Sequence, residues 1–142
     1  MTAIEPSTAM IPQSESERQG AIRRRLDEIW AAAAARDFAR LESFHRYGPD
    51  FTSFKDGAPR EDAAGNAAGE RAMFGALEGP AVDMRDLRVA VYGDVGLVTF
   101  NGHFTAALHG SPVALDQQVT MVFVDDDEWR IVHEHFSPLA GT

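Results

Sequence analysis

Two histidines separated by a single residue are the clearest candidates for chemistry in this chain. His133 and His135 lie in an apolar segment of strand character, and strand alternation places both imidazoles on one face. Such a pair binds a metal ion when a third ligand converges on it, and the imaginable ligands are His103 and Glu134, although Glu134 points to the opposite face. Because the chain has no His-Glu-x-x-His motif and no cysteine, we expect no metal. A general base or an orienting hydrogen bond stays open for the pair, since histidine titrates near neutral pH.

The segment that holds these histidines is predicted to be the second strand of a β-hairpin. Residues 119–124 and 129–137 are rich in Val, Ile, Phe and Trp, which favour a pleated sheet, and three aspartates at 125–127 favour a turn between them. Regular alternation puts Trp129, Ile131, His133 and His135 on one face, and Arg130, Val132, Glu134 and Phe136 on the other. We expect this strand to end the folded domain.

Three helices are predicted ahead of the sheet. Ser14 and Glu17 have the spacing of a capping box, and the helix that follows carries one apolar stripe. The stripe consists of Ile22, Leu26, Ile29, Trp30 and Ala33. Asp37 is expected to cap a second helix over residues 38–47. A short strand at 51–54 and an Ala- and Gly-rich loop at 62–69 then lead to a third helix at 70–77, with Met73, Phe74 and Leu77 facing inward.

From residue 81 the apolar period changes to two, which indicates strands. Strands are expected over residues 81–91, 95–108 and 113–124, with a bulge near Asp86, where the alternation slips. Three helices followed by a four-stranded meander give an α+β order. We expect one domain over residues 14–138, a disordered N-terminal tail at 1–13 and a C-terminal tail at 139–142.

The ending WRIVHEHFS, after an antiparallel strand and an acidic turn, resembles the last strand of SnoaL-like domains. These belong to the nuclear transport factor 2-like (cystatin-like) superfamily, whose fold is an α+β cone of helices packed on a strongly curved antiparallel sheet. The resemblance covers residues 15–138 in element order. It implies this fold, but it does not by itself imply one reaction, because the superfamily includes isomerases, cyclases, hydrolases and non-catalytic binding modules.

A cone of this kind implies a pocket at its open end. Such clefts are lined by apolar and aromatic groups with a few polar ones. The expected ligand contacts are Trp30, Tyr47, Phe51, Phe54, Met73, Phe74 and His135. For any one of the apolar residues, a plain core position is the commoner role.

Enzymes on this fold that resemble ketosteroid isomerase or polyketide cyclase imply two catalytic groups. One removes a proton next to a carbonyl, and the other donates a hydrogen bond to the enolate that forms. The candidate bases are His133, His103, Asp116 and Asp83, and the candidate donors are Tyr47, Tyr92, Asn101 and Gln118. In the resembling families the His-x-His pair also has a structural role, bonding nearby backbone, and this alternative stays open.

The kinase association domain has a similar Trp…His-x-His-x-Ser ending, and there strand arginines line a pocket for carboxylates. Aligned on the shared Trp and on the turn before the second strand, this chain has Gly102 and Thr120 at those positions. The departure argues against an anion-binding pocket of that type.

Composition excludes several classes of partner. A net charge of −9 argues against nucleic acid and against an anionic membrane surface, both of which require clustered Lys and Arg. Without cysteine there are no disulfides, which suits a reducing cytoplasm. We see no apolar stretch of the ~20 residues that a membrane span needs and no secretory signal. A cytoplasmic location is therefore expected.

Two functional readings follow. The first is an enzyme without cofactor, an isomerase, cyclase or hydrolase that acts on a small hydrophobic carbonyl compound. The second is a non-catalytic module for ligand binding or assembly. A homodimer is expected in either case, through an outer sheet face that includes Thr99, Asn101, His103 and Met121.

Overall fold

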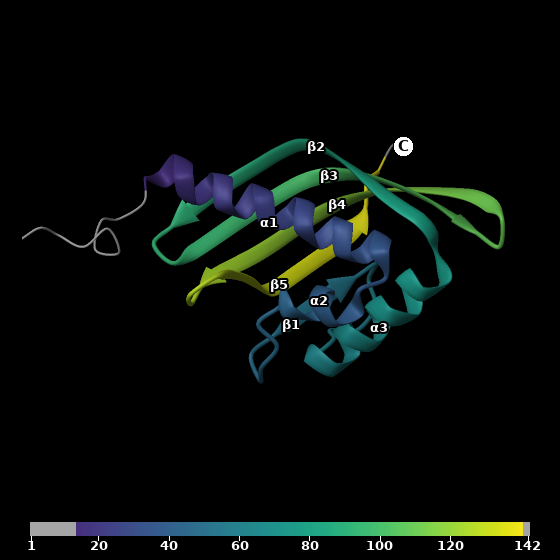
Figure 1. The fold of residues 1–142 in the computed structure, drawn as a ribbon, viewed down its shortest axis with the longest axis horizontal. Helices are drawn as coiled ribbons and strands as arrows, with labels where there is room; N and C mark the ends of the chain where they lie inside the picture. Colours follow the sequence, from purple (N-terminus) through teal and green to yellow (C-terminus); the bar gives the residue numbers. More distant parts are fainter. Residues whose placement is uncertain (1–13, 141–142) are drawn as a thin grey trace, which may run out of the picture.

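A computed structural model describes residues 14–140 as three helices and one sheet (Figure 1). The helices are α1 (Glu15–Ala35), α2 (Phe38–Ser43) and α3 (Ala63–Ala76). The strands are β1 (Thr52–Lys55), β2 (Glu78–Tyr92), β3 (Val95–Leu108), β4 (Ser111–Asp125) and β5 (Trp129–Pro138). The predicted N-terminal tail and the last two residues of the predicted C-terminal tail lie outside the described residues. No helix in the described part is long and apolar enough to span a membrane.

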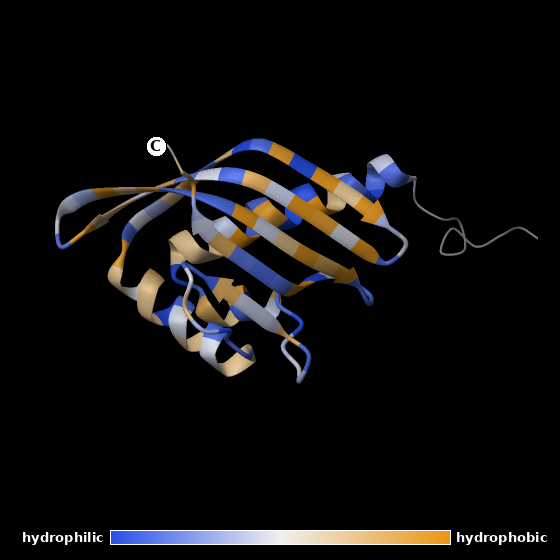
Figure 2. Cartoon of the chain, turned by 180° about the vertical axis from the view of Figure 1, so that it is seen from behind, coloured by the Kyte–Doolittle hydropathy of each residue, from blue (hydrophilic) through white to orange (hydrophobic). Residues whose placement is uncertain are grey.

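The sheet has the strand order β1-β5-β4-β3-β2. The four long strands are antiparallel neighbours, and the short β1 adds to β5 in parallel. Bands of hydrophobic and hydrophilic residues alternate along the long strands (Figure 2), as a sheet with one buried face requires. The predicted cone, α+β with helices packed on a curved sheet, is thereby confirmed.

Helix α1 lies across one face of this sheet (Figure 1). It begins with the predicted capping box, in which Ser14 Oγ accepts a hydrogen bond from the Glu17 amide at 3.1 Å. Its apolar stripe is buried against the inner faces of the strands, and this contact forms the core. The buried core residues include Ile22, Leu26, Ile29, Val98, Phe100, Val119, Met121, Phe123 and Ile131.

Two helix boundaries differ from the sequence-based expectation. Residues 62–69 are not a loop, because Asp62 accepts a hydrogen bond from the Gly65 amide at 2.9 Å and starts α3 at Ala63. The alanines that follow favour a helix more than the glycines oppose it. Helix α2 ends at Ser43 rather than near residue 47, because the backbone of residues 44–46 turns away to bond with Ile131 of β5.

A bulge in β5 reverses its faces halfway along the strand. Phe123 of β4 pairs with Ile131, but the neighbouring Val122 pairs with His133, so that Val132 is an extra residue without a partner. The expectation that Trp129, Ile131, His133 and His135 share a face is therefore wrong from His133 onward. The core face continues from Ile131 to Glu134, which is 2% exposed. A second register shift, between Arg85 and Arg88 in β2, confirms the bulge predicted near Asp86.

Candidate active site

A cavity of about 370 Å³ lies between α3, the helix-facing side of the sheet and the C-terminal half of α1. Most of its wall is apolar, from residues such as Ile29, Trp30, Leu41, Met73, Phe74, Leu77, Phe104, Val113, Leu115, Met121 and Phe136. The charged or titratable lining residues are His45, Lys55, Asp56, Glu70 and Glu134. This volume and this balance of apolar and polar groups are typical of a site for a small organic molecule.

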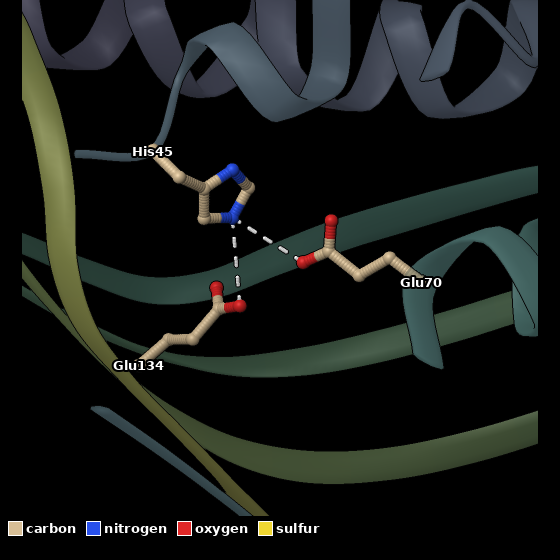
Figure 3. Close-up of side chains that lie close together, drawn as sticks. All are labelled: His45, Glu70 and Glu134. Atoms are coloured by element: carbon tan, nitrogen blue, oxygen red, sulfur yellow. Dashed lines mark ion pairs between the residues drawn. The ribbon is translucent and has the colours of Figure 1, made fainter. Parts of the chain in front are cut away.

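Three titratable side chains from separate elements meet in the cavity wall: His45, Glu70 and Glu134 (Figure 3). His45 follows α2 and is held against β5, because the Arg46 amide donates to the Ile131 carbonyl at 2.8 Å and the Ile131 amide donates to the Phe44 carbonyl at 2.9 Å. Glu70 lies in the middle of α3, and Glu134 follows the bulge of β5. We call these three residues the His45 cluster.

The His45 cluster contains polar atoms that have no hydrogen-bond partner. His45 Nε2 lies 3.3 Å from Glu70 Oε1 and 3.5 Å from Glu134 Oε1, both longer than the ~2.8 Å of a charge-assisted hydrogen bond. In the described part of the chain, four buried side-chain nitrogen and oxygen atoms have no such partner, and three of them belong to this cluster. Buried polar atoms are seldom left unpaired. The cluster is therefore able to accept a shared proton or a polar group of a ligand.

The proton of the imidazole can be assigned at one nitrogen. His45 Nδ1 lies 2.9 Å from the Leu41 carbonyl, which only accepts, so Nδ1 carries a proton. Burial alone lowers the pKa of His45, but the carboxylates of Glu134 and Glu70 outweigh it and raise this pKa to about 10. His45 is therefore an imidazolium at neutral pH, and its second N–H faces both carboxylates.

The two carboxyl groups of the cluster have opposite pKa shifts. Burial raises the pKa of Glu70, and the neighbouring His45 offsets this only in part. Burial also acts to raise the pKa of Glu134, but the close imidazolium of His45 and then the ammonium of Lys55 lower it well below its usual range. Glu134 is thus the fixed counterion of His45, while Glu70 binds a proton more readily than an ordinary carboxylate.

A buried amide connects Glu70 to Lys55, the single lysine of the chain. Asn66, in α3 and fully buried, accepts a hydrogen bond from Lys55 Nζ at 2.6 Å through Oδ1 and donates from Nδ2 to Glu70 Oε1 at 3.2 Å. The same Nδ2 donates to the Tyr47 hydroxyl at 2.8 Å. One amide group therefore holds a carboxylate and an ammonium group side by side in the cavity wall.

The His45 cluster has ligand types that a divalent cation could use, since the ligand atoms lie within 4.8 Å of one another. However, Lys55 Nζ lies 4.0 Å from Glu134 Oε1 and supplies a positive charge of its own. With His45 protonated, these two cations balance the two carboxylates without an ion. We therefore interpret the cluster as a site for protons.

The bases predicted from the sequence lie on the opposite, outer face of the sheet. His103 pairs in register with Asp83 on one side and with Asp116 on the other, and His103 Nδ1 lies 2.7 Å from Asp116 Oδ1. His133 Nδ1 lies 2.8 Å from the Thr52 hydroxyl, and His135 lines a polar groove of this outer face. None of these four bases lines the cavity, and neither does His135, which was predicted as a ligand contact. Met121, expected on the outer face, is buried in the core instead.

The predicted apolar contacts divide into three groups. Trp30, Met73 and Phe74 line the cavity. Tyr47 and Phe51 pack around His45 instead, Tyr47 stacked at 4.8 Å between ring centroids and Phe51 edge-on at 5.9 Å. Phe54 faces outward, with its ring 5.7 Å from that of His133 and 5.4 Å from that of His135.

Sequence reasoning did not single out any member of the His45 cluster as a candidate base, although two of them carried a signal. Glu70 precedes Met73, Phe74 and Leu77 by three, four and seven residues, which puts it on their inward helical face. Glu134 shares its strand face with Phe136. His45 had no such signal, because a loop and its bonds to β5 position it.

Comparison with known proteins supports the fold. A crystal structure of a provisionally assigned dehydratase of the NTF2-like family from Streptomyces avermitilis matches with a TM-score of 0.82 and 19% identity, over 90% of this chain and all of the other. An NTF2-like protein from Salmonella enterica matches with a TM-score of 0.79 and 20% identity, over 91% and 96% of the two chains.

A provisionally assigned calcium/calmodulin-dependent protein kinase II association domain from Xanthomonas campestris also matches, with a TM-score of 0.74 and 16% identity over 99% and 97% of the two chains. No curated protein matches this chain. The model of one family, the SnoaL-like domain, matches residues 22–141. This match covers most of the chain, so the chain belongs to the SnoaL-like domain family.

Proposed function

We propose that the protein is an acid–base enzyme that removes a proton from the carbon next to the carbonyl group of a small apolar molecule. This step is common to isomerisation, aldol-type cyclisation and dehydration. The observation that carries the proposal is the buried His45 cluster, which opens into an apolar cavity. A perturbed titratable group in such a cavity is the usual sign of a catalytic site.

Glu70 is the base in this proposal. Its side chain is 10% exposed, against 1% for His45 and 3% for Glu134, so it is the member of the cluster most open to the cavity. A carboxylate with a raised pKa is a stronger base near neutral pH than an ordinary one. Glu70 takes the proton from carbon, the electron pair of the broken C–H bond forms the C=C bond of an enolate, and the π electron pair of the carbonyl moves to its oxygen.

Lys55 is the group that stabilises this enolate oxygen. Its ammonium lines the cavity, and Asn66 holds it beside Glu70. A fixed cation at a developing negative charge is among the largest contributions to catalysis. Protonated Glu70 then returns the proton in one of three ways. It protonates another carbon of the enolate, it protonates a β-hydroxyl group that leaves as water, or it protonates the alkoxide formed when the enolate attacks a second carbonyl.

His45 and Glu134 are positioning residues in this scheme. The imidazolium faces Glu70 at 3.3 Å, and Glu134 keeps it charged. A neutral His45 would leave Glu70 without its partner and raise its pKa further.

The family and one solved structure favour this chemistry. SnoaL-like domains resemble the cyclases and isomerases considered above, and the Streptomyces protein is provisionally assigned as a dehydratase. The second reading, an assembly or ligand-binding module, draws on the similarity to the kinase association domain. In both readings we propose a homodimer through the outer sheet face, which carries polar groups such as Thr99, Asn101, Gln118 and Thr120.

Deuterium exchange tests the enzyme reading without knowledge of the natural substrate. The protein is incubated in D2O with a panel of hydrophobic ketones, and loss of the α-proton signals is followed by ¹H NMR. We expect wild-type protein to accelerate exchange of at least one ketone, and Glu70→Gln to lower that rate by ~100-fold or more.

The matched control is Glu42→Gln, which removes a carboxylate that pairs with Arg71 outside the cavity and should leave the rate unchanged. A metal chelator should also leave it unchanged. If ketones bind but no exchange depends on Glu70, the non-catalytic binding module becomes the better account.

A further inference from the structure

The outer end of the cavity is lined by large apolar side chains that solvent reaches. Among the described residues, six large hydrophobic side chains are exposed, and three of them line the cavity: Met73 (47% exposed), Val113 (38%) and Leu115 (51%). Exposed apolar groups gathered at one place mark a binding surface more often than scattered ones do.

Two facing elements carry these side chains. Met73 is in the C-terminal half of α3, while Val113 and Leu115 are in the hairpin of β3 and β4. The end of this hairpin extends beyond the rest of the sheet (Figure 1), and β4 has no second neighbour there, because β5 pairs with β4 only as far as Gln117. We call residues 106–115 the arm.

The apolar walls form a path that leads away from Glu70. On α3, Glu70, Met73 and Leu77 line the cavity in succession, which spans ~10 Å along the helix. On the facing strand, Phe104 and Leu108 line it, a span of ~13 Å. The apolar part of the cavity is thus longer than a small carbonyl group bound at the polar inner end would occupy.

The charges lie only at the inner end of this path. The titratable lining residues come from the His45 cluster and from Lys55 and Asp56 at the end of β1. Asp56 Oδ1 accepts a hydrogen bond from Gln117 Nε2 at 2.6 Å. The lining residues of the arm are Ala106, Leu108, Val113, Ala114 and Leu115, without a charge among them. The inner end has three carboxyl groups, from Glu70, Glu134 and Asp56, but only two cations, His45 and Lys55, so it disfavours an anionic head group and suits a neutral carbonyl.

We propose that the substrate is an elongated, neutral, amphipathic molecule. Its carbonyl end lies at Glu70 and Lys55, and its apolar chain runs between α3 and the arm, with the far end close to solvent beside Met73 and Leu115. The inference rests on the proposed function for the position of the reacting end. It adds that the length of the apolar chain determines affinity.

A homologous series of straight-chain 2-alkanones tests this proposal. Kd for each ketone is measured by titration calorimetry with the full-length protein. Kd should fall about three- to fourfold with each added methylene and level off once the chain passes the arm. Leu115→Asn and, independently, Met73→Gln should reduce the gain in affinity per methylene for long ketones, and should raise the Kd of short ketones much less.

Val95→Asn is the matched control. Val95 is similarly exposed at 39% but lies at the opposite end of β3 and does not line the cavity, so the whole series should bind as it does to wild-type protein. A Kd that does not change with chain length overturns the elongated substrate, and Glu70-dependent exchange on short ketones then leaves the proposed function standing.

Two other results are also decisive. If Leu115→Asn converts a dimer to a monomer in sedimentation but leaves the Kd values of the 2-alkanones unchanged, a second copy of the chain covers the arm. The proposal is then overturned. If no ketone of any length binds, both the elongated substrate and the proposed function are rejected.

Discussion

Two carboxyl groups beside the same histidine have opposite pKa shifts, and the roles that we propose for them rest on this difference. Glu134 is more buried than Glu70, but it lies near both His45 and Lys55 and stays ionised. Glu70 faces the cavity and has a raised pKa. A pair of titratable groups with diverging pKa values is a general way to identify a base and its supporting group.

Replacing His45 by Gln should lower the melting temperature most at about pH 6.5 and least near pH 10. The pKa of His45 is raised from 6.5 to about 10 in the folded protein. The stability that this shift contributes is fully present below about pH 6.5 and is lost as the pH rises through about 10. The difference in melting temperature between wild type and His45→Gln should therefore shrink over this range, as measured by circular dichroism.

The control for this prediction is His135→Gln, because His135 is exposed on the outer face. Its difference from wild type should show no such trend. A His45→Gln difference that stays constant up to pH 10 would mean that the imidazole is neutral in the folded protein.

At the scale of secondary structure elements, β5 determines which side chains reach the cavity. The sequence correctly predicts that residues 129–137 form a strand, because Val, Ile, Phe and Trp dominate it. It does not predict the extra residue Val132, since a bulge depends on the pairing of β5 with β4. That single residue turns Glu134 inward and His133 and His135 outward, so regular alternation predicted the wrong face for these three residues.

The packing of α1 on the sheet depends on a close approach at Gly96 of β3. A Cβ atom at this position would lie 2.5 Å from Ile22 Cδ1. Gly96→Ala should destabilise the protein by about 1–3 kcal/mol, as measured by urea unfolding. Ile22→Val removes the clashing methyl group, so the double variant should be more stable than the sum of the two single effects predicts.

Gly48→Ala is the matched control, because no atom lies within 4 Å of a Cβ built there. It should change the free energy of unfolding little. Strictly additive effects of Gly96→Ala and Ile22→Val would show that α1 does not rest on β3 at this point.

For the whole molecule, the fold could be predicted and the site could not. Hydrophobic periodicity, the capping box at Ser14 and the ending WRIVHEHFS were sufficient for the α+β cone. The site depends on contacts between distant segments: a loop at His45, a helix at Glu70 and a strand at Glu134, which no local pattern relates. The apolar lining of the cavity could be predicted in part, because Trp30, Met73 and Phe74 lie on inward helical faces.

The proposed homodimer predicts twice the chain mass in sedimentation at micromolar concentration. Thr120→Arg places a charge in the polar groove of the outer face, and it should shift the mass towards the monomer. Ser16→Arg adds the same charge on an exposed position of α1 and should have no effect. A monomeric wild-type protein would rule out this interface.

The pH dependence of ketone deuterium exchange tests the central claim, that Glu70 is a base in an apolar active site, most directly. Only the carboxylate form of Glu70 takes a proton, and its pKa lies above the usual 4.5. After subtraction of the buffer rate, the enzymatic rate should therefore rise with pH above the ordinary carboxyl range and then level off, and Glu70→Gln should abolish this rise. A rate that is already level at the usual carboxyl pKa, or a rise that survives in Glu70→Gln, would contradict the assignment of Glu70 as the base.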